Sequence, residues 1–236
     1  MTGCATSPDD PGAGVGAERH SGEGITGALL GATGMVGSFV LEQALEDGYG
    51  VRALARTPAK LAAYADRIEI IAGDARDPDV LRRLVKGSDV VISALGPVRG
   101  DGAAALALST DVARLMTGIL PEAGHRRYVV VSGGAVQVPG DQRDLLGWTI
   151  RKLAQLAYGS TVRDKQQEFE ILAASSLQWT LVRCPLIDPE PFQRPAVASL
   201  ATPPAFRLRA GELARFLLEQ AHSADYRQRA PFLGSY

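Results

Sequence analysis

The sequence predicts an α/β fold, a doubly wound parallel sheet with helices on both faces in three α/β/α layers. Two observations predict it. Short apolar runs alternate with helical patterns from residue 25 to about residue 222, which is typical of consecutive βαβ units. The first apolar run, Ile25 to Leu30, leads directly into a glycine-rich turn that is followed by a helical pattern, as in dinucleotide-binding turns.

The strands are expected where short apolar runs end at glycine, proline or polar residues. The run at 89–95 is nearly continuous in apolar residues, as expected for a strand covered on both faces. The predicted strands are 25–30, 50–55, 68–72, 89–95, 127–132 and 179–183.

The helices are expected between these strands, where apolar residues recur three and four positions apart. Pro58 suits the first turn of a short helix, and Asp77 precedes Pro78 as a helix cap. Two helical segments are expected to begin at residues 35 and 58. The others are expected at 77 to about 86, 103–122, 145–174 and 211–222, and the segment 145–174 is expected to break near Gly159.

Two parts of the chain differ in composition. Residues 1–24 are rich in Gly, Pro, Ser, Ala and Asp, so we expect a disordered tail that cannot bury enough apolar surface to fold. Residues 25–236 are expected to form one domain. The segments 136–160 and 186–207 are predicted to be insertions around a substrate pocket.

Composition also narrows the function classes. The formal net charge is −1 with basic and acidic residues interspersed, which predicts no nucleic-acid or membrane partner. No apolar run is long enough to span a membrane, and no signal pattern begins the chain; we expect a cytoplasmic protein, monomeric or weakly dimeric. The two cysteines and three histidines are scattered, so we predict no disulfide framework and no metal site.

The glycine turn predicts a cofactor site. Gly31 permits the tight turn, Gly34 lets the backbone approach a pyrophosphate, and Gly37 lets the helix pack against the strand. The amides of the first helical turn then point at the phosphates. The residues expected to bind here are Gly31, Thr33, Gly34, Met35, Val36 and Gly37.

Ligands of such sheets bind at the carboxyl ends of the strands, which selects further candidates. They are Arg56, Thr57, Asp74, Ala75, Ala94, Leu95, Gly96, Ser132, Pro185 and Leu186.

The end of the second predicted strand indicates which dinucleotide binds. NAD-preferring sites place Asp or Glu there, about 20 residues after the glycine turn, whereas this chain has Arg56 and Thr57. A guanidinium can hold a 2′-phosphate, and Lys60 lies one helical turn further on. We therefore predict NADP (NADPH) rather than NAD, the alternative being that Arg56 is a solvated charge. Asp74 either accepts from the adenine amino group or partners the backbone of its own turn.

Five motifs resemble a known family. They are Gly-Ala-Thr-Gly-Met-Val-Gly at 31–37, Ala-Leu-Ala-Arg-Thr-Pro-Ala-Lys-Leu at 53–61, Gly-Asp-Ala-Arg-Asp at 73–77, Val-Ile-Ser-Ala-Leu-Gly at 91–96 and Trp-Thr-Leu-Val-Arg-Cys-Pro at 179–185. Together they resemble atypical short-chain dehydrogenase/reductases, in particular the NAD(P)H-binding, NmrA-like group that includes biliverdin reductase B and flavin reductases. The resemblance covers about residues 25 to 220. It implies a Rossmann-like fold, an NADP-binding role for the positions above, and a substrate pocket over the nicotinamide.

The chain departs from this family at one important position. Most short-chain dehydrogenases carry a Tyr-x-x-x-Lys pair, in which the tyrosine protonates the substrate and the lysine holds the ribose. Here Lys165 matches the lysine, but Thr161 replaces the tyrosine. Tyr158 lies two helical turns before Lys165, roughly 10 Å along the axis, so it acts only if the helix starts late or bends at Gly159. Otherwise we expect it to pack or to line the substrate pocket.

Ser132, Lys165 and Tyr158 are thus the candidate catalytic residues. Ser132 matches the family serine and is expected either to orient the substrate or to satisfy the strand-end backbone. Lys165 is either a cofactor contact or a solvated helix lysine. Glu168 and Glu170 are expected in exposed helix pairs, and Cys184 as a buried or pocket-lining thiol rather than a nucleophile.

These features predict an NADPH-dependent oxidoreductase that reduces a small aromatic or conjugated substrate. Such acceptors need little acid from the protein, since water can supply the proton. The missing tyrosine equally predicts a non-catalytic NADP-sensing regulator of the NmrA type. A non-redox isomerase or cyclase on the same fold is the third alternative.

Overall fold

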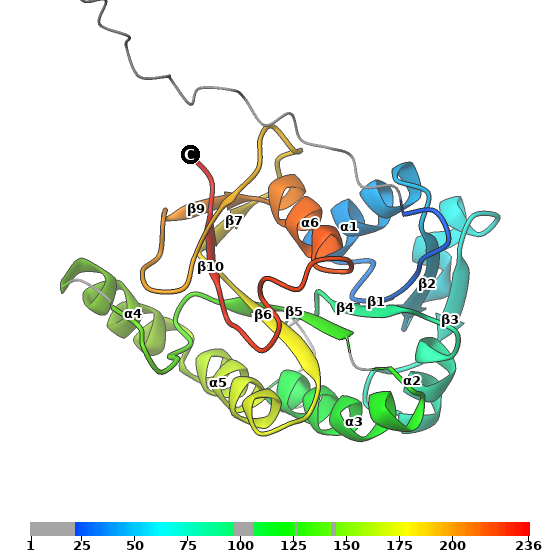
Figure 1. Ribbon diagram of the computed structural model, residues 1–236, viewed down its shortest axis with the longest axis horizontal. Helices are drawn as coiled ribbons and strands as arrows, with labels where there is room; N and C mark the ends of the chain where they lie inside the picture. The colour runs from blue at the N-terminus through cyan, green and yellow to red at the C-terminus, as the bar shows by residue number, and fades with distance from the viewer. Residues whose placement is uncertain (1–21, 97–105, 126, 143–144) are drawn as a thin grey trace, which may run out of the picture.

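A mostly parallel eight-stranded sheet crosses the middle of the protein (Figure 1). The structure is a computed structural model that describes residues 22–96, 106–125, 127–142 and 145–236. The strand order is β3-β2-β1-β4-β5-β6-β10-β8, and β8 alone runs antiparallel to its neighbour β10. The strands are β1 (Thr26–Leu30), β2 (Gly50–Ala55), β3 (Glu69–Ala72), β4 (Val90–Ser93), β5 (Arg127–Gly133), β6 (Gln178–Cys184), β8 (Val197–Ser199) and β10 (Phe232–Gly234).

Helices cover both faces of this sheet, so the predicted three-layer α/β/α fold is confirmed (Figure 1). One face carries α1 (Met35–Glu46) and α6 (Ala210–Glu219), and the other carries α2 (Pro78–Val85), α3 (Leu108–Glu122) and α5 (Gly159–Ala173). The helix α4 (Leu145–Ala157) lies at the edge of the molecule, and η1 (Pro58–Tyr64) is a short 3₁₀ helix after β2.

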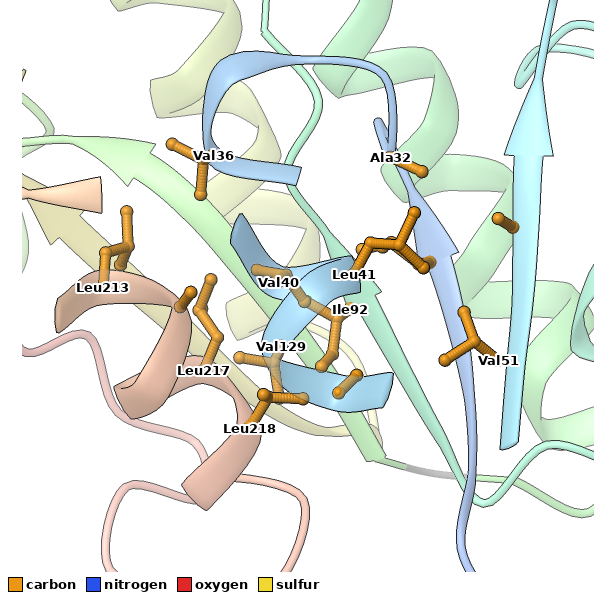
Figure 2. Packing of buried hydrophobic residues seen from close by; sticks show 14 of the residues in the cluster. Ala32, Val36, Val40, Leu41, Val51, Ile92, Val129, Leu213, Leu217 and Leu218 are labelled. Atoms are coloured by element: carbon orange, nitrogen blue, oxygen red, sulfur yellow. The ribbon is translucent and has the colours of Figure 1, made fainter. Parts of the chain in front are cut away.

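The core is split by the sheet into two layers, because successive strand residues point to opposite faces. In β4, Val90 and Ile92 pack toward α1 and α6, whereas Val91 packs toward α2 and α3. Figure 2 shows Val40 of α1 and Leu217 of α6 meeting over the sheet on the first face. Both faces of β4 are therefore buried, which explains its nearly continuous apolar sequence.

The elements predicted from periodicity are confirmed at nearly the expected positions. The long helical segment breaks at Tyr158, which precedes α5 as its N-cap residue. The last predicted helix ends earlier, at Glu219, and the expected helix start at 103–105 lies outside the described residues. Four strands were not predicted, namely β8, β10 and the separate two-stranded sheet of β7 (Leu186–Asp188) and β9 (Arg207–Arg209). Each has three residues, which is too short to show a periodic pattern.

The boundary of the expected N-terminal tail needs a correction. Residues 1–21 lie outside the described residues. The amide of Gly22 donates to the carbonyl oxygen of Asp47 at 2.7 Å, and the amide of Ile25 donates to that of Gly22. Gly22 also packs on the ring of Tyr49. Gly22 therefore belongs to the folded part of the chain, three residues before the predicted start of the domain, because its backbone is hydrogen-bonded on both sides.

Candidate functional site

A cavity of about 490 Å³ opens at the carboxyl edge of the sheet, around the ends of β1, β2, β3 and β4. This edge is the expected ligand site of a doubly wound sheet, at the point where the strand order reverses between β1 and β4. The cavity is lined by Gly31, Thr33, Gly34, Leu54, Ala55, Arg56, Thr57, Lys60, Asp74, Ala75, Arg76, Ala94, Leu95, Gly96 and Leu108.

The glycine turn between β1 and α1 has no room for a side chain at Gly31 or at Gly37. Gly31 has φ +83°, and a Cβ there would lie 2.7 Å from the carbonyl oxygen of Ala94. A Cβ on Gly37 would lie 2.0 Å from the carbonyl oxygen of Gly31, so only glycine allows α1 to begin so close to β1. Gly34 is the extended N-cap residue of α1 and is exposed at the cavity. The N-terminus of α1 thus faces the cavity as an anion-binding site would.

Three cationic residues also line the cavity. Arg56 directly follows β2, Lys60 lies on η1, and Arg76 follows β3. Asp74 is the carboxylate among the lining residues. The local charge is therefore positive, which favours an anionic ligand.

Asp74 is held by its own turn. Its Oδ1 accepts hydrogen bonds from the backbone amide of Arg76 at 2.8 Å and from Nε of Arg76 at 3.1 Å. The hydrogen bond from Arg76, and more weakly the charge of Arg56, lower the pKa of Asp74. Of the two expectations for Asp74, the pairing with its own turn is therefore observed. Sequence analysis missed Arg76, although it lies within the motif Gly-Asp-Ala-Arg-Asp at 73–77.

Several predicted cofactor residues lie outside this cavity. Met35 is 44% exposed and does not line the cavity, whereas Val36 packs in the core beneath α1. Gly37 contributes the close contact between helix and strand. Pro185 is half-buried and Leu186 is 70% exposed, both beyond the end of β6.

Lys165 lies behind the cavity wall. Its Nζ donates to the carbonyl oxygens of Val131 at 3.0 Å and Leu95 at 3.3 Å, and to Oε2 of Glu168 at 3.0 Å. An ammonium has three N–H donors, so these three acceptors match its full set. The side chains of Lys165 and Glu168 are both buried.

This pairing corrects the expectation that Glu168 lies in an exposed helix pair. The Glu168 side chain is 2% exposed, and burial raises its pKa while the ammonium of Lys165 opposes that change. A buried carboxylate needs such a partner, because removing a charge from water is costly. Glu170 is exposed, as expected.

The other candidate catalytic residues, and Thr161, lie outside the cavity. Ser132 is buried at the carboxyl end of β5, and among the described residues its hydroxyl has no hydrogen-bond partner. Thr161 is half-buried on α5, whereas Tyr158 is 68% exposed. None of these residues lines the 490 Å³ cavity. Their roles toward a substrate stay predictions.

The thiol of Cys184 matches the expectation of a buried group. It is 4% exposed at the end of β6, and burial raises its pKa to about 12 although the charge of Lys165 opposes the shift. A thiol in this state is not a nucleophile near neutral pH.

The geometry agrees with a comparison against known families. A family described as NAD(P)H-binding matches residues 31–224. The chain belongs to this NAD(P)H-binding family. The match begins at Gly31, the first glycine of the turn, and covers all the residues that line the cavity. A nicotinamide dinucleotide is therefore the cofactor class, and the glycine turn and the cationic residues fit its phosphates.

Solved structures of similar proteins share the fold of this NAD(P)H-binding chain. ChuY from Escherichia coli O157:H7, described as an anaerobilin reductase, has a TM-score of 0.74 at 21% identity, over 89% of this chain and 97% of ChuY. A short-chain dehydrogenase/reductase from Veillonella parvula has a TM-score of 0.67 at 17% identity, over 89% and 94% of the two chains. These likenesses show the same Rossmann-like α/β fold that the sequence predicts.

One curated relative is similar in sequence over a shorter stretch. The ceramide reductase of Caulobacter vibrioides is 30% identical over 114 residues. The stretch is 48% of this chain and 36% of that protein, so the chain matches about a third of its relative's length.

In the described part of the chain, no helix is both long and apolar enough to cross a membrane. Within the same residues, no group of three or more His, Cys, Asp or Glu side chains is placed to hold a metal ion.

Proposed function

We propose that this protein is an NADPH-dependent reductase of the atypical short-chain dehydrogenase type, acting on a small aromatic or conjugated substrate. The main support is the group of Arg56, Lys60 and Arg76 around the cavity. The end of the second strand is where dinucleotide-binding folds select between a ribose hydroxyl and a 2′-phosphate. Guanidinium groups bind phosphate with paired, charge-assisted hydrogen bonds. The nearby carboxylate, Asp74, is already engaged by Arg76.

Different parts of the cavity would hold different parts of the cofactor. The N-terminus of α1 beside Gly34 would hold the pyrophosphate, and the cations after β2 and β3 the 2′-phosphate. When bound, the nicotinamide supplies a hydride to the acceptor. Leu95 and Gly96 line the wall at the end of β4 and would shield part of the cofactor from water.

The proton for the reduced acceptor is proposed to come from water. Thr161 replaces the usual tyrosine, and a threonine hydroxyl is no acid near neutral pH. The three N–H groups of Lys165 are matched by acceptors within the protein. Aromatic and conjugated acceptors tolerate this arrangement, because their reduced anions are stabilised by delocalisation until water protonates them.

The names of similar proteins support the reaction class more than the substrate. Anaerobilin reductase and ceramide reductase are both reductases, named for different acceptors. We therefore propose reduction as the common chemistry, with the acceptor set by the segments 136–160 and 186–207.

The second candidate function is an NADP sensor that binds the dinucleotide without reaction. The replacement of tyrosine by Thr161 favours it as well. A non-redox isomerase or cyclase that keeps the cofactor bound is the remaining alternative.

The experiment follows the absorbance of NADPH in the presence of flavins, quinones and biliverdin. We expect consumption with at least one acceptor. Tight NADP binding without consumption by any of them would reject the reductase in favour of the sensor. Conversion of a substrate without net NADPH oxidation would instead indicate an isomerase.

Cofactor choice is tested with Arg56→Ala and with the control Arg67→Ala, an exposed arginine that does not line the cavity. Losing one charge-assisted contact to phosphate costs about 1.5–3 kcal/mol, or on the order of 10- to 100-fold in affinity. We expect NADP binding to weaken by this factor in Arg56→Ala, with NAD binding unchanged. An equal loss for both cofactors would show that Arg56 does not read the 2′-phosphate.

A further inference from the structure

The N-terminus of α3 is capped by a residue of another helix. Ala107, the N-cap residue of α3, makes no side-chain hydrogen bond. Instead, Asp164 of α5 accepts from the amide of Ser109 at 3.0 Å and from that of Thr110 at 2.8 Å. The hydroxyl of Thr110 also donates to the backbone oxygen of Asp164. Asp164 is 5% exposed. Its buried charge is stabilised by these donors and by the positive end of the helix dipole of α3.

The next residue of α5, Lys165, contacts the chain that follows β4. The last paired residues of β4 and β5 are Ser93 and Val130. Beyond that pair, the ammonium of Lys165 bridges the carbonyl oxygens of Leu95 and Val131. Buried carbonyl groups at strand ends need donors, and Lys165 provides them while Glu168 balances its charge.

Lys165 thus contacts the chain just after β4, and Asp164 contacts the start of α3. Leu95 and Gly96 after β4, and Leu108 at the start of α3, line the cofactor cavity. Ser109 follows Leu108 directly, so the cap formed by Asp164 lies one residue from this wall.

We propose that Asp164 and Lys165 are positioning residues for the cofactor, which set the placement of the cavity wall without contacting the ligand. The proposal rests on the proposed binding of a nicotinamide dinucleotide in this cavity. Preorganised supports of this kind act on affinity because a ligand that must order its own site binds more weakly.

The test compares Asp164→Ala with Arg163→Gln, an exposed neighbour on the same helix. NADP affinity is measured by titration at a temperature where circular dichroism shows each variant fully folded. Amide hydrogen exchange is measured in parallel at residues 108–112. For Asp164→Ala we expect faster exchange at Ser109 and Thr110 and an NADP dissociation constant raised about tenfold, in line with one lost charged hydrogen bond. Arg163→Gln should match the wild type in both.

Two further variants keep the test decisive. Asp164→Asn retains one acceptor oxygen and should restore part of the affinity, and it replaces Asp164→Ala if that variant does not fold. Lys165→Met combined with Glu168→Gln removes both charges and should weaken NADP binding by a similar factor. Folded variants that are less stable but bind NADP as tightly as the wild type would overturn the proposal, since that is the signature of a purely structural role.

The outcome is separable from that of the proposed function. If the wild type bound neither NADP nor NAD, the proposed function would fail on its own. Hydrogen exchange at Ser109 and Thr110 would then still report whether Asp164 holds the start of α3.

Discussion

The ammonium of Lys165 and the carboxylate of Glu168 meet at 3.0 Å inside the protein, one helical turn apart on α5. Their side chains are 8% and 2% exposed. Such a pair stabilises a fold only when its other hydrogen-bonding groups are satisfied. Lys165 meets this condition through the carbonyl oxygens of Leu95 and Val131, so the pair joins α5 to β5 and to the chain that follows β4.

The pair predicts a non-additive double-mutant cycle. Lys165→Met should lower the free energy of unfolding by about 3–5 kcal/mol, because it leaves the Glu168 carboxylate buried without a counter-charge. Adding Glu168→Leu should recover a large part of that loss, since both charges are then gone. Urea unfolding at neutral pH measures each step. If the two single losses simply added in the double variant, the two charges would not be coupled.

The glycine turn predicts a strong effect of one methyl group. In Gly37→Ala, the new Cβ would lie 2.0 Å from the carbonyl oxygen and 2.6 Å from the carbonyl carbon of Gly31. Because both are backbone atoms, α1 must move away from β1. We expect a loss of about 1–3 kcal/mol or more in unfolding free energy, together with weakened NADP binding in the protein that folds.

The matched control is Gly118→Ala on the exposed side of α3, where a Cβ would meet nothing within 4 Å. Alanine in a helix interior is better than glycine by about 0.5–1 kcal/mol, so this variant should be slightly more stable. Normal stability and NADP affinity in Gly37→Ala would contradict the close packing of helix on strand.

A second buried ion pair predicts the stability of the segment after β5. Nη1 of Arg183 donates to both carboxylate oxygens of Asp141, at 2.7 and 2.8 Å, and the guanidinium lies 3.5 Å from the ring centre of Phe232. Asp141→Asn should cost about 3 kcal/mol of unfolding free energy, because Arg183 is 1% exposed and loses its counter-charge. Urea unfolding gives the value.

The control for that pair is Arg82→Gln, which removes two ion pairs between exposed side chains, to Asp79 and to Glu122. Exposed pairs contribute little to stability, so its unfolding curve should nearly overlay that of the wild type. A similarly small effect of Asp141→Asn would mean that water reaches the buried pair.

The buried thiol of Cys184 predicts that the unfolding free energy of the protein falls at alkaline pH. Burial raises the pKa of its thiol from 9.0 to about 12. Between these values the unfolded chain loses the proton and the native protein keeps it, so the unfolding free energy falls as pH rises. A full proton difference corresponds to about 1.4 kcal/mol per pH unit. Cys184→Ala should flatten the stability profile over this range, relative to the wild type.

Alkylation checks the same thiol independently. Native protein treated with iodoacetamide at mildly alkaline pH should show no modification of the peptide that contains Cys184, and protein unfolded in urea should show complete modification. Rapid labelling of the native protein would mean that the thiol is accessible as a thiolate.

Much of the fold could be predicted because its signals are local. The spacing of Gly31, Gly34 and Gly37, and the apolar runs of β1 to β6, depend on neighbouring residues alone. The four three-residue strands could not be predicted, since they form only where β10 pairs with β6 and β8, and where β7 pairs with β9.

Part of the candidate site could be predicted from the sequence, again where the signal is local. Arg56 and Asp74 follow predicted strands, so the rule about carboxyl ends selected them. Arg76 was missed because only the folded turn brings its guanidinium onto Asp74 and into the cavity.

The local order of residues was sufficient to indicate a dinucleotide-binding α/β fold and the cations beside its second strand, because backbone turns and periodicity arise from near neighbours. Only the packed structure decided the surroundings of the α5 side chains. Glu168 was expected in solvent and lies buried against Lys165, and Asp164 caps a helix 55 residues away in the chain. The physical reason is that burial and pairing of charges depend on which surfaces meet, and the packing of α5 against α3 and the sheet is a long-range contact.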